Sequence, residues 1–375
     1  MRLDSISPPG GRLNRVTSLH SAAICMNTVV YSKPFFPRMG GLERNTLTLC
    51  QALTELGHEV RLVTETPSDE SDSYSFSVTR TQSIAQFFKE LSGADRLIVN
   101  GNISLWMHPL AWIRRVPYAT IYHNFRGYER RGTGPMVAVG NKIRGAVARR
   151  AWANVFTSTY AKERVGLPAS HVVFNPVDKQ MEQFYDKEER QGRDSDAPFL
   201  FAGRLIEGKG LFVIAGALER LDGELEVYVE VAGEGRDADR FSERVQGLTT
   251  VRVELLGRLE GPALVEHYQN SRALIVPSTT HKEGNPLVIA EALCAGTPVI
   301  ASDQPPMIES VGGAGIIVEQ GNAQALADAM REMKSNEEAY RRYRERAENR
   351  AEVFSYRRYR KRIREIFGTG ENKFK

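Results

Sequence analysis

The fold is decided by residues 273–301, which read ALIVPSTTHKEGNPLVIAEALCAGTPVIA. The stretch opens with an apolar run, Ala273–Val276, whose length and residue types favour a buried strand. A polar loop follows, and an apolar helix then begins at Pro286, because proline suits the first turn of a helix. A second apolar run, 298–301, closes the unit. A strand, a helix and another strand in this order predict two parallel strands joined by a crossover helix.

The same alternation of apolar runs and amphipathic stretches extends in both directions along the chain. It stops at the charged segment DKEERQGRDSDA, residues 186–197, and restarts at Phe199. Repeated strand–helix units with apolar strands predict parallel sheets covered on both faces. We therefore expect an α/β protein of two Rossmann-like, doubly wound parallel-sheet domains that face each other across a cleft. The predicted segments are a loose extension (1–20), a first domain (21–185), a linker (186–197), a second domain (198–350) and a C-terminal helix (351–375) that returns to the first domain.

Composition limits the class of protein. The 375 residues are 41% hydrophobic and 26% charged, which is typical of a globular chain. Three scattered cysteines, Cys25, Cys50 and Cys294, predict neither a disulfide framework nor a zinc site, so we expect a cytoplasmic protein. No apolar run approaches the roughly 18 residues that span a bilayer. No recognisable DNA- or RNA-binding pattern is present, and we expect no nucleic-acid partner.

The net charge of +4 conceals an uneven distribution. Residues 1–179 carry 22 Lys and Arg against 13 Asp and Glu, whereas residues 180–340 carry 15 against 28. A basic first half predicts a polyanionic or membrane-surface partner, or else a solvated basic face. Within it, residues 130–152 combine six basic side chains with apolar ones. That pattern is typical of a segment lying on an anionic membrane, and equally of a packed helix with a basic outer face.

Two glycine-rich turns match the chemistry of anion binding. Gly40 and Gly41 stand at a helix start, where backbone N–H groups can bind phosphate oxygens, although a plain strand-to-helix turn would also use glycine. The segment GRLIEGKG, residues 203–210, follows an apolar strand. Arg204 and Lys209 within it favour a phosphate site, because a guanidinium binds phosphate through paired N–H groups and lysine acts as a point charge.

Two glutamates follow the strand Ala273–Val276. Glu283 lies in the polar loop, and Glu291 lies inside the apolar helix. A carboxylate inside a buried helix is costly unless it is paired. We therefore expect Glu291 to bind either a diol or a basic side chain, a structural Glu–Arg pair being the plainer alternative. The N–H groups at the helix start, residues 284–286, are suited to a diphosphate.

These residues, in this order, resemble the glycosyltransferases of family 4, which are retaining enzymes with the GT-B fold. Glu283 and Glu291 match the family's E-x7-E motif at the right spacing. Residues 203–210 match its phosphate-binding segment, and 175–178 (NPVD) resemble the motif that ends its first domain. Residues 285–286 (NP) stand where Phe-Gly is common, which leaves the donor sugar open.

The resemblance implies a role for each of these residues. Arg204 and Lys209 would neutralise the departing diphosphate of the donor. Glu291 would bind the ribose hydroxyls, and Glu283 would hold hydroxyls of the transferred sugar. His123, which follows an apolar strand, would face that sugar. The further donor-binding residues implied in this way are Gly40, Gly41, Gly203, Gly284, Asn285, Pro286 and Leu287.

The expected activity is transfer of a sugar from a nucleoside diphosphate sugar to a hydroxyl acceptor, with retention of configuration. We expect no cofactor and no metal ion, because the D-x-D at 194–196 lies in the linker rather than at a strand end. We expect a role in bacterial cell-surface glycan or glycolipid synthesis. The basic first domain and the stretch 130–152 further predict a lipid-linked glycan as acceptor and a peripheral position on the inner face of the plasma membrane. A nucleotide-sugar epimerase and a non-catalytic nucleotide-sugar-binding protein remain open on the same scaffold.

Overall fold

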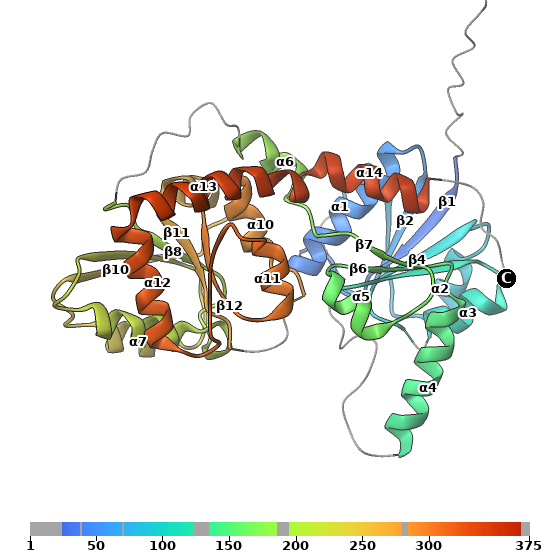
Figure 1. Ribbon diagram of the computed structural model, residues 1–375. Coiled ribbons are helices and arrows are strands. Elements are labelled where there is room, and N and C mark those ends of the chain that lie inside the picture. Colours follow the sequence, from blue (N-terminus) through green and yellow to red (C-terminus); the bar gives the residue numbers. More distant parts are fainter. Residues whose placement is uncertain are drawn as a thin grey trace, which may run out of the picture.

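The computed structural model of the chain describes residues 25–37, 40–69, 71–104, 106–123, 135–185, 195–279 and 284–368. Within these residues the chain forms two parallel β-sheets, each covered by helices on both faces (Figure 1). The predicted fold class, two Rossmann-like domains, is therefore confirmed. The extension 1–20 and residues 186–194 of the predicted linker lie outside the described residues.

The first domain is a seven-stranded sheet with the order β3-β2-β1-β4-β5-β6-β7. The side chains of neighbouring residues in a strand point to opposite faces of the sheet. Val29 and Val30 therefore belong to different cores, and both are fully buried. Its strands are β1 (Asn27–Tyr31), β2 (Glu59–Thr64), β3 (Ser77–Arg80), β4 (Arg96–Gly101), β5 (Tyr118–Tyr122), β6 (Ala153–Phe156) and β7 (Ser170–Val172). Its helices are α1 (Gly41–Glu55), α2 (Ile84–Glu90), α3 (Met107–Ile113), α4 (Pro135–Arg150), α5 (Thr159–Val165) and α6 (Lys179–Glu182), with the 3₁₀ turn η2 (Gln183–Tyr185).

The second domain is a six-stranded sheet with the order β10-β9-β8-β11-β12-β13. Its strands are β8 (Phe199–Ala202), β9 (Val227–Ala232), β10 (Val251–Gly257), β11 (Ala273–Val276), β12 (Val299–Ser302) and β13 (Gly315–Val318). Its helices are α7 (Leu211–Leu221), α8 (Ala238–Val245), α9 (Gly261–Asn270), α10 (Leu287–Cys294), α11 (Pro305–Val311), α12 (Ala323–Ser335) and α13 (Glu337–Ala351), with the 3₁₀ turns η3 (Glu207–Lys209) and η4 (Glu352–Phe354). One face of the sheet packs against α7, α8 and α12, and the other packs against α9, α10 and α11.

Parallel pairing places the loops that carry the predicted site residues at one edge of each sheet. In the first domain β1 pairs with β2 and β4, and β4 pairs with β5, all in parallel. The carboxyl ends of β1, β4 and β5 therefore lie side by side, and the loops that follow them share one edge. In the second domain the same holds for β8, β9, β11 and β12.

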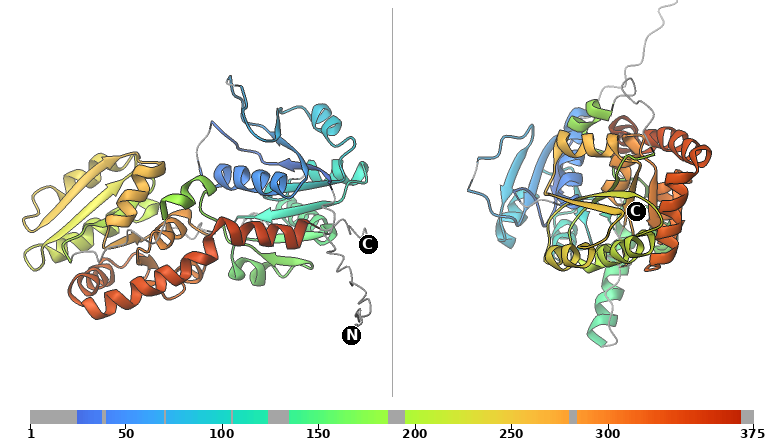
Figure 2. Two further views of the ribbon diagram at one scale, coloured as in Figure 1. Left: turned by 90° about the horizontal axis from the view of Figure 1, so that it is seen from above. Right: turned by 90° about the vertical axis from the view of Figure 1, so that its left-hand side faces the viewer.

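The last two helices lie along both domains (Figures 1 and 2). α13 covers the second domain, and α14 (Tyr356–Phe367) lies on the first. Ser355 separates them, because its hydroxyl caps α14 by accepting a hydrogen bond from the Arg358 N–H at 3.2 Å. Tyr359 and Ile363 of α14 are buried in the core that also contains strands of the first sheet. None of the helices in the described parts of the chain is long and apolar enough to cross a bilayer.

Candidate active site

A cavity of about 740 Å³ lies between the two domains. Every predicted site residue lines it except Glu283, which lies outside the described residues. The first domain contributes Gly40 and Gly41 at the start of α1 and His123 after β5. The second domain contributes Gly203, Arg204, Lys209, Gly284, Asn285, Pro286, Leu287 and Glu291.

The cationic loop after β8 is held by close backbone contacts. Gly203 has a φ of 153°, and a Cβ atom on Gly233 would overlap the Gly203 carbonyl oxygen, so the loops after β8 and β9 approach at backbone distance. Lys209 ends η3. The next residue, Gly210, has a φ of 82°, and a side chain there would overlap a carbonyl oxygen at the end of β11. These contacts fix the positions of Arg204, which is exposed, and Lys209, which is half-buried, at the cavity wall.

A buried aspartate supports the same loop. Asp237 Oδ2 accepts a hydrogen bond from the Glu207 N–H at 2.8 Å, at the start of η3. Its Oδ1 lies 3.4 Å from Arg240 Nη1. Asp237 and Asp239 form a second D-x-D, which the sequence reasoning did not consider. Within the described residues the Asp237 carboxylate caps the turn η3 and pairs with Arg240.

The loop before α10 touches the first domain. A Cβ atom on Gly284 would overlap the carbonyl oxygen of His123, so the two backbones are in contact at this point. Asn285 is buried, and its Oδ1 accepts a hydrogen bond from the Asn175 N–H at 3.2 Å. In return Asn175 Nδ2 donates to the Asn285 carbonyl at 3.1 Å. Glycine at position 284 is what allows the domains to meet this closely.

Buried amide side chains connect His123 to this contact between the domains. His123 Nε2 lies 2.7 Å from Asn100 Oδ1. Asn100 Nδ2 donates to Asn45 Oδ1 at 3.1 Å, and Asn45 Nδ2 donates to Asn175 Oδ1 at 3.0 Å. Since Asn100 presents its oxygen, His123 carries a proton on Nε2. Burial lowers the pKa of His123 to about 4, so the imidazole is neutral at physiological pH.

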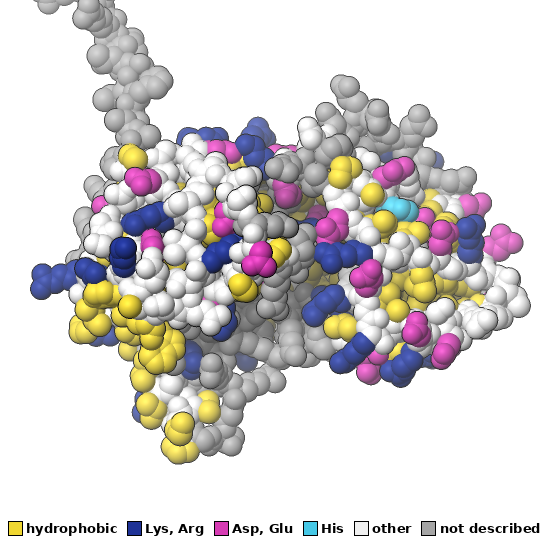
Figure 3. Space-filling model, turned by 180° about the vertical axis from the view of Figure 1, so that it is seen from behind, with side chains coloured by type: hydrophobic (Ala, Val, Ile, Leu, Met, Phe, Trp, Pro, Cys, Tyr) yellow, Lys and Arg dark blue, Asp and Glu magenta, His cyan; other side chains and the backbone are white. Residues whose placement is uncertain are grey.

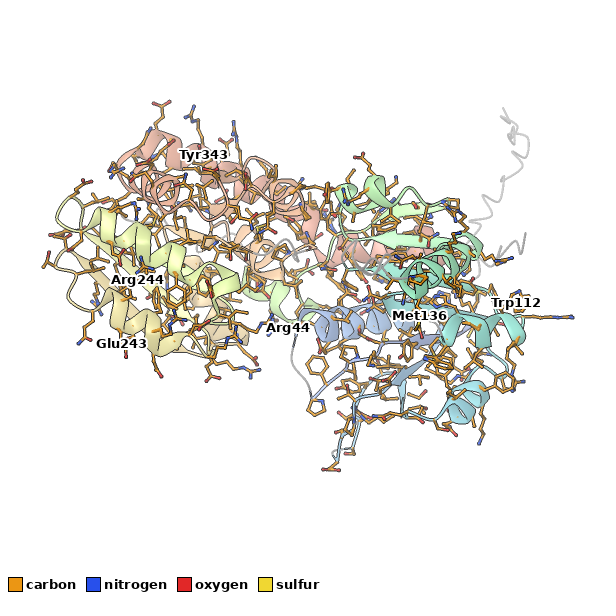
Figure 4. All side chains as sticks on the ribbon, turned by 90° about the horizontal axis from the view of Figure 1, so that it is seen from below. Arg44, Trp112, Met136, Glu243, Arg244 and Tyr343 are labelled. Atoms are coloured by element: carbon orange, nitrogen blue, oxygen red, sulfur yellow. The ribbon has the colours of Figure 1, made fainter. Side chains whose placement is uncertain are left out.

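Glu291 lies at the other end of the cavity, on α10. It is 9% exposed, and its Oε2 accepts a hydrogen bond from the Tyr268 hydroxyl at 2.9 Å. Its Oε1 lies 3.3 Å from Arg44 Nη1, and Arg44 reaches across from α1 between the domains (Figure 4). Burial raises the pKa of Glu291, and Arg44 opposes that rise. The basic partner expected for this carboxylate is therefore present, and it comes from the opposite domain.

A second contact between the domains involves Glu309 on α11. Its carboxylate accepts hydrogen bonds from the Thr159 N–H at 2.8 Å and from the Tyr160 N–H at 3.3 Å, at the start of α5. A carboxylate at this position satisfies helix N–H groups that lack intrahelical partners and interacts favourably with the helix dipole. Glu309 therefore stabilises this contact between the two domains.

Two residues of the site escaped the sequence reasoning: Arg44, which lines the cavity, and Asn100, which bonds to His123. Asn100 is the last but one residue of the fully buried strand β4, and a polar side chain near the carboxyl end of such a strand is a signal that could have identified it. Arg44 lies one helical turn after Gly40, on the helix that begins at the cavity. Its partner Glu291 is 247 residues away, and no sequence spacing indicates that pair.

The two-domain fold matches known structures over almost their whole length. Anabaena HepE in complex with UDP gives a TM-score of 0.71, and the match covers 91% of this chain and 99% of that one at 17% identity. A glycosyltransferase from Rickettsia africae also gives 0.71, covering 93% of this chain and 100% of that one at 18% identity. The chain thus has the GT-B architecture of two Rossmann-like domains.

Two family models match the chain, one on each domain. The model described as Glycosyltransferase Family 4 matches residues 39–180, and the model described as Glycosyl transferases group 1 matches residues 183–350. Together they include every strand of the two sheets except β1, and all the residues that line the cavity. The chain belongs to the family 4 glycosyltransferases, as its motifs predicted.

Curated relatives match shorter stretches. The D-inositol 3-phosphate glycosyltransferase of Xylanimonas cellulosilytica is 38% identical over 118 residues, which are 30% of this chain and 28% of that protein. The lipopolysaccharide core biosynthesis glycosyltransferase LpsE of Rhizobium meliloti is 29% identical over 157 residues, which are 40% of this chain and 44% of that protein. The matched stretch therefore spans less than half the length of either relative.

Proposed function

We propose that the protein transfers a glycosyl unit from a nucleoside diphosphate sugar to a hydroxyl acceptor, with retention of anomeric configuration and without a metal ion. One observation carries the proposal. The residues that line the cavity between the domains include two cations on one loop, Arg204 and Lys209, a buried carboxylate, Glu291, and the loop before α10. Cations suit a diphosphate, and a carboxylate suits a vicinal diol such as ribose.

The proposed step breaks the bond between the anomeric carbon and the diphosphate oxygen. The electron pair of that bond stays on the leaving oxygen, while positive charge develops on the sugar. Arg204 and Lys209 stabilise the departing charge, and the N–H groups before α10 add a further partial positive charge. The acceptor oxygen then bonds to the same face of the anomeric carbon and gives its proton to the leaving phosphate oxygen. Two fixed cations at the leaving group make a metal ion unnecessary.

The other residues position the donor in this proposal. The Glu291 carboxylate accepts hydrogen bonds from the ribose hydroxyls and exchanges part of its contact with Arg44 for them. His123 keeps Nε2 on Asn100, which leaves Nδ1 as an acceptor for a sugar hydroxyl. Gly40 and Gly41 allow the start of α1 to approach the diphosphate, and Glu283 would bind the transferred sugar.

The acceptor we propose is the hydroxyl of a bacterial cell-surface glycan or glycolipid, carried on a lipid at the inner face of the plasma membrane. The basic first half of the chain supports an anionic surface as partner. The similarity to LpsE, a protein named for lipopolysaccharide core biosynthesis, supports this acceptor class.

A panel of nucleotide sugars tests the proposal. UDP-glucose comes first, because the solved Anabaena HepE structures include complexes with UDP and with UDP-glucose. A true donor should raise the unfolding temperature, since it binds both domains at once. Proton NMR of the product should show the donor's anomeric configuration, and excess chelator should leave turnover unchanged. Inversion, or loss of activity in chelator, would refute those parts of the mechanism; conversion of the donor without any acceptor would indicate an epimerase.

A further inference from the structure

Large apolar side chains are exposed on one part of the first domain. Of the nine such residues that are exposed in the described chain, six lie on or beside α3 and α4. We call them the docking surface: Trp106, Trp112, Ile113, Met136, Val139 and Ile143. Trp106 is 67% exposed, Trp112 is 62% exposed and Met136 is 87% exposed. Such a concentration of exposed apolar side chains marks an interaction site.

Figure 3 shows hydrophobic side chains gathered on the face of the first domain from which α4 projects, and Figure 4 labels Trp112 and Met136 away from Arg44. The two helices that carry the docking surface are anchored in the core. Met107 and Ala111 of α3 are buried, and Val147 of α4 packs against the same cluster. The Tyr118 hydroxyl of β5 donates to the Val147 carbonyl at 2.8 Å. The exposed side chains therefore project from helices that are anchored in the core, α4 through its C-terminal half.

The structure changes the interpretation of the basic stretch 130–152. Arg144 is buried and bonds to Asn141 at 3.3 Å, so it is not part of an outer basic face. Val147 belongs to the core. The large apolar side chains that are exposed on α4 are Met136, Val139 and Ile143. Trp106, just before α3, and Trp112, on α3, complete the docking surface, and the sequence reasoning did not use them.

The charged side chains on the two helices of the docking surface are of one sign. α3 and α4 contain no Asp or Glu. Arg114 and Arg115 follow α3, Lys142 and Arg149 lie on α4, and all four are exposed. Residues 104–161 contain nine Lys and Arg against one Glu. An apolar surface bordered by cations complements a lipid surface with anionic head groups.

We propose that the docking surface seats the protein on an anionic bilayer, with the tryptophans at head-group depth. Tryptophan favours this depth because its ring is apolar and its N–H remains solvated. A second copy of the chain fits less well, since a symmetric dimer through this surface would bring cations against cations. The docking surface therefore fits a lipid bilayer better than it fits a second copy of the chain.

The position of the docking surface suits a lipid-linked acceptor, and in this respect the inference rests on the proposed function. Trp106 precedes α3 in the connection from the carboxyl end of β4, and His123 follows β5 at the same edge of the sheet. Trp106 therefore joins the docking surface to the edge of the sheet that lines the cavity, whereas Trp112, at the other end of α3, lies away from it (Figure 4). The acceptor's head group could then reach the cavity while its lipid stays in the bilayer.

Vesicle sedimentation with the full chain tests the inference. The wild-type protein should bind phosphatidylcholine vesicles that contain phosphatidylglycerol, bind pure phosphatidylcholine vesicles far more weakly, and lose binding as salt is added. Replacing Trp106→Ser and Trp112→Ser together should weaken binding at least about tenfold, because two large apolar side chains no longer enter the lipid. The matched control is Leu255→Ser with Ile308→Ser, two exposed apolar residues of the second domain, and it should bind like wild type.

Two further readouts separate the possible outcomes. Thermal stabilisation by UDP should be the same in both double variants and in wild type. If UDP stabilises none of them, the proposed function is contradicted, whereas vesicle binding still tests the docking surface. Equal vesicle binding by wild type and the tryptophan variant, or no binding by wild type, would overturn the inference. So would a wild-type dimer in analytical ultracentrifugation that the tryptophan changes dissociate, because the occupant would then be a second copy.

Discussion

Arg44 and Glu291 show how one residue pair can couple a binding site to the position of a domain. The carboxylate is nearly buried, and desolvation favours its neutral form. Arg44 from the other domain opposes that effect at 3.3 Å. In the proposed mechanism the donor's ribose competes for this carboxylate, so nucleotide binding and the domain contact share a single group.

Replacing Arg44→Gln should raise the pH at which UDP affinity is lost on acidification. Without the guanidinium the pKa of Glu291 rises further, so the carboxylate becomes protonated at higher pH and stops accepting hydroxyl hydrogen bonds. Calorimetric titration of UDP between pH 5 and 8 should therefore show affinity lost at a higher pH than in wild type. Arg61→Gln is the matched control, because Arg61 pairs with Glu90 on the first domain away from the cavity. Coincident profiles for Arg44→Gln and wild type would contradict the coupling.

His108 should make the fold sensitive to acid. It is fully buried between the Ser104 carbonyl at 2.8 Å and the Thr120 hydroxyl at 2.9 Å, and burial lowers its pKa to about 4. The unfolded chain binds a proton near the ordinary pKa of about 6.5, so the free energy of unfolding should fall by about 2 kcal/mol from pH 7 to pH 5 through this residue alone. Urea unfolding of His108→Gln should show a smaller change over the same interval; an unchanged pH dependence would refute the assignment.

At the scale of elements, the short loop before α10 sets how closely the domains meet. Gly284→Ala places a methyl group against the His123 carbonyl, so the loop and the first domain must separate. Turnover should fall about 100-fold, because small displacements of reacting groups have effects of that order. The unfolding temperature should change little, since the substitution lies outside both cores. Gly140→Ala on α4, where the added carbon meets only the end of the Arg144 side chain, is the control. Wild-type turnover in Gly284→Ala would contradict the account.

Fully apolar strands and glycine-rich loops were the elements that sequence could predict. Strands such as β8 and β11 are buried on both faces, so their apolar runs indicate them directly. β3 escaped because it is a partly exposed edge strand, SVTR, without an apolar run. α11 escaped because two prolines open its seven residues and mask its apolar pattern. The row of asparagines behind His123 could not be predicted, since it depends on the register between β4, α1 and the end of β7.

At the scale of the whole molecule, polar contacts join the two domains across their interface. Glu309 at the start of α5, Asn285 on Asn175 and Arg44 on Glu291 all cross the interface. Polar contacts of this kind can be exchanged for contacts with a ligand or with water, unlike a packed core. The α14 helix adds an apolar connection, because it follows α13 of the second domain and packs into the core of the first.

Glu309→Gln should favour the open arrangement. The neutral amide interacts less with the N–H groups and dipole of α5, by an amount that corresponds to roughly a threefold to tenfold change in the closed population. The KM for the donor should rise by about that factor with kcat little changed, because the donor must supply part of the closing free energy. Small-angle scattering should show a larger radius of gyration without donor. Glu345→Gln on the exposed side of α13 is the control, and an unchanged KM for Glu309→Gln would contradict a closing role.

The central claim is that the cations at the end of β8 stabilise a departing diphosphate, and single-turnover kinetics of Arg204→Ala with saturating donor test it most directly. The account predicts a rate constant about 100- to 1,000-fold below wild type, because the lost charge acts mainly on the transition state. Arg252→Ala, which removes an exposed arginine of β10 outside the cavity, should keep the wild-type rate. An Arg204→Ala enzyme that turns over at the wild-type rate would contradict the claim.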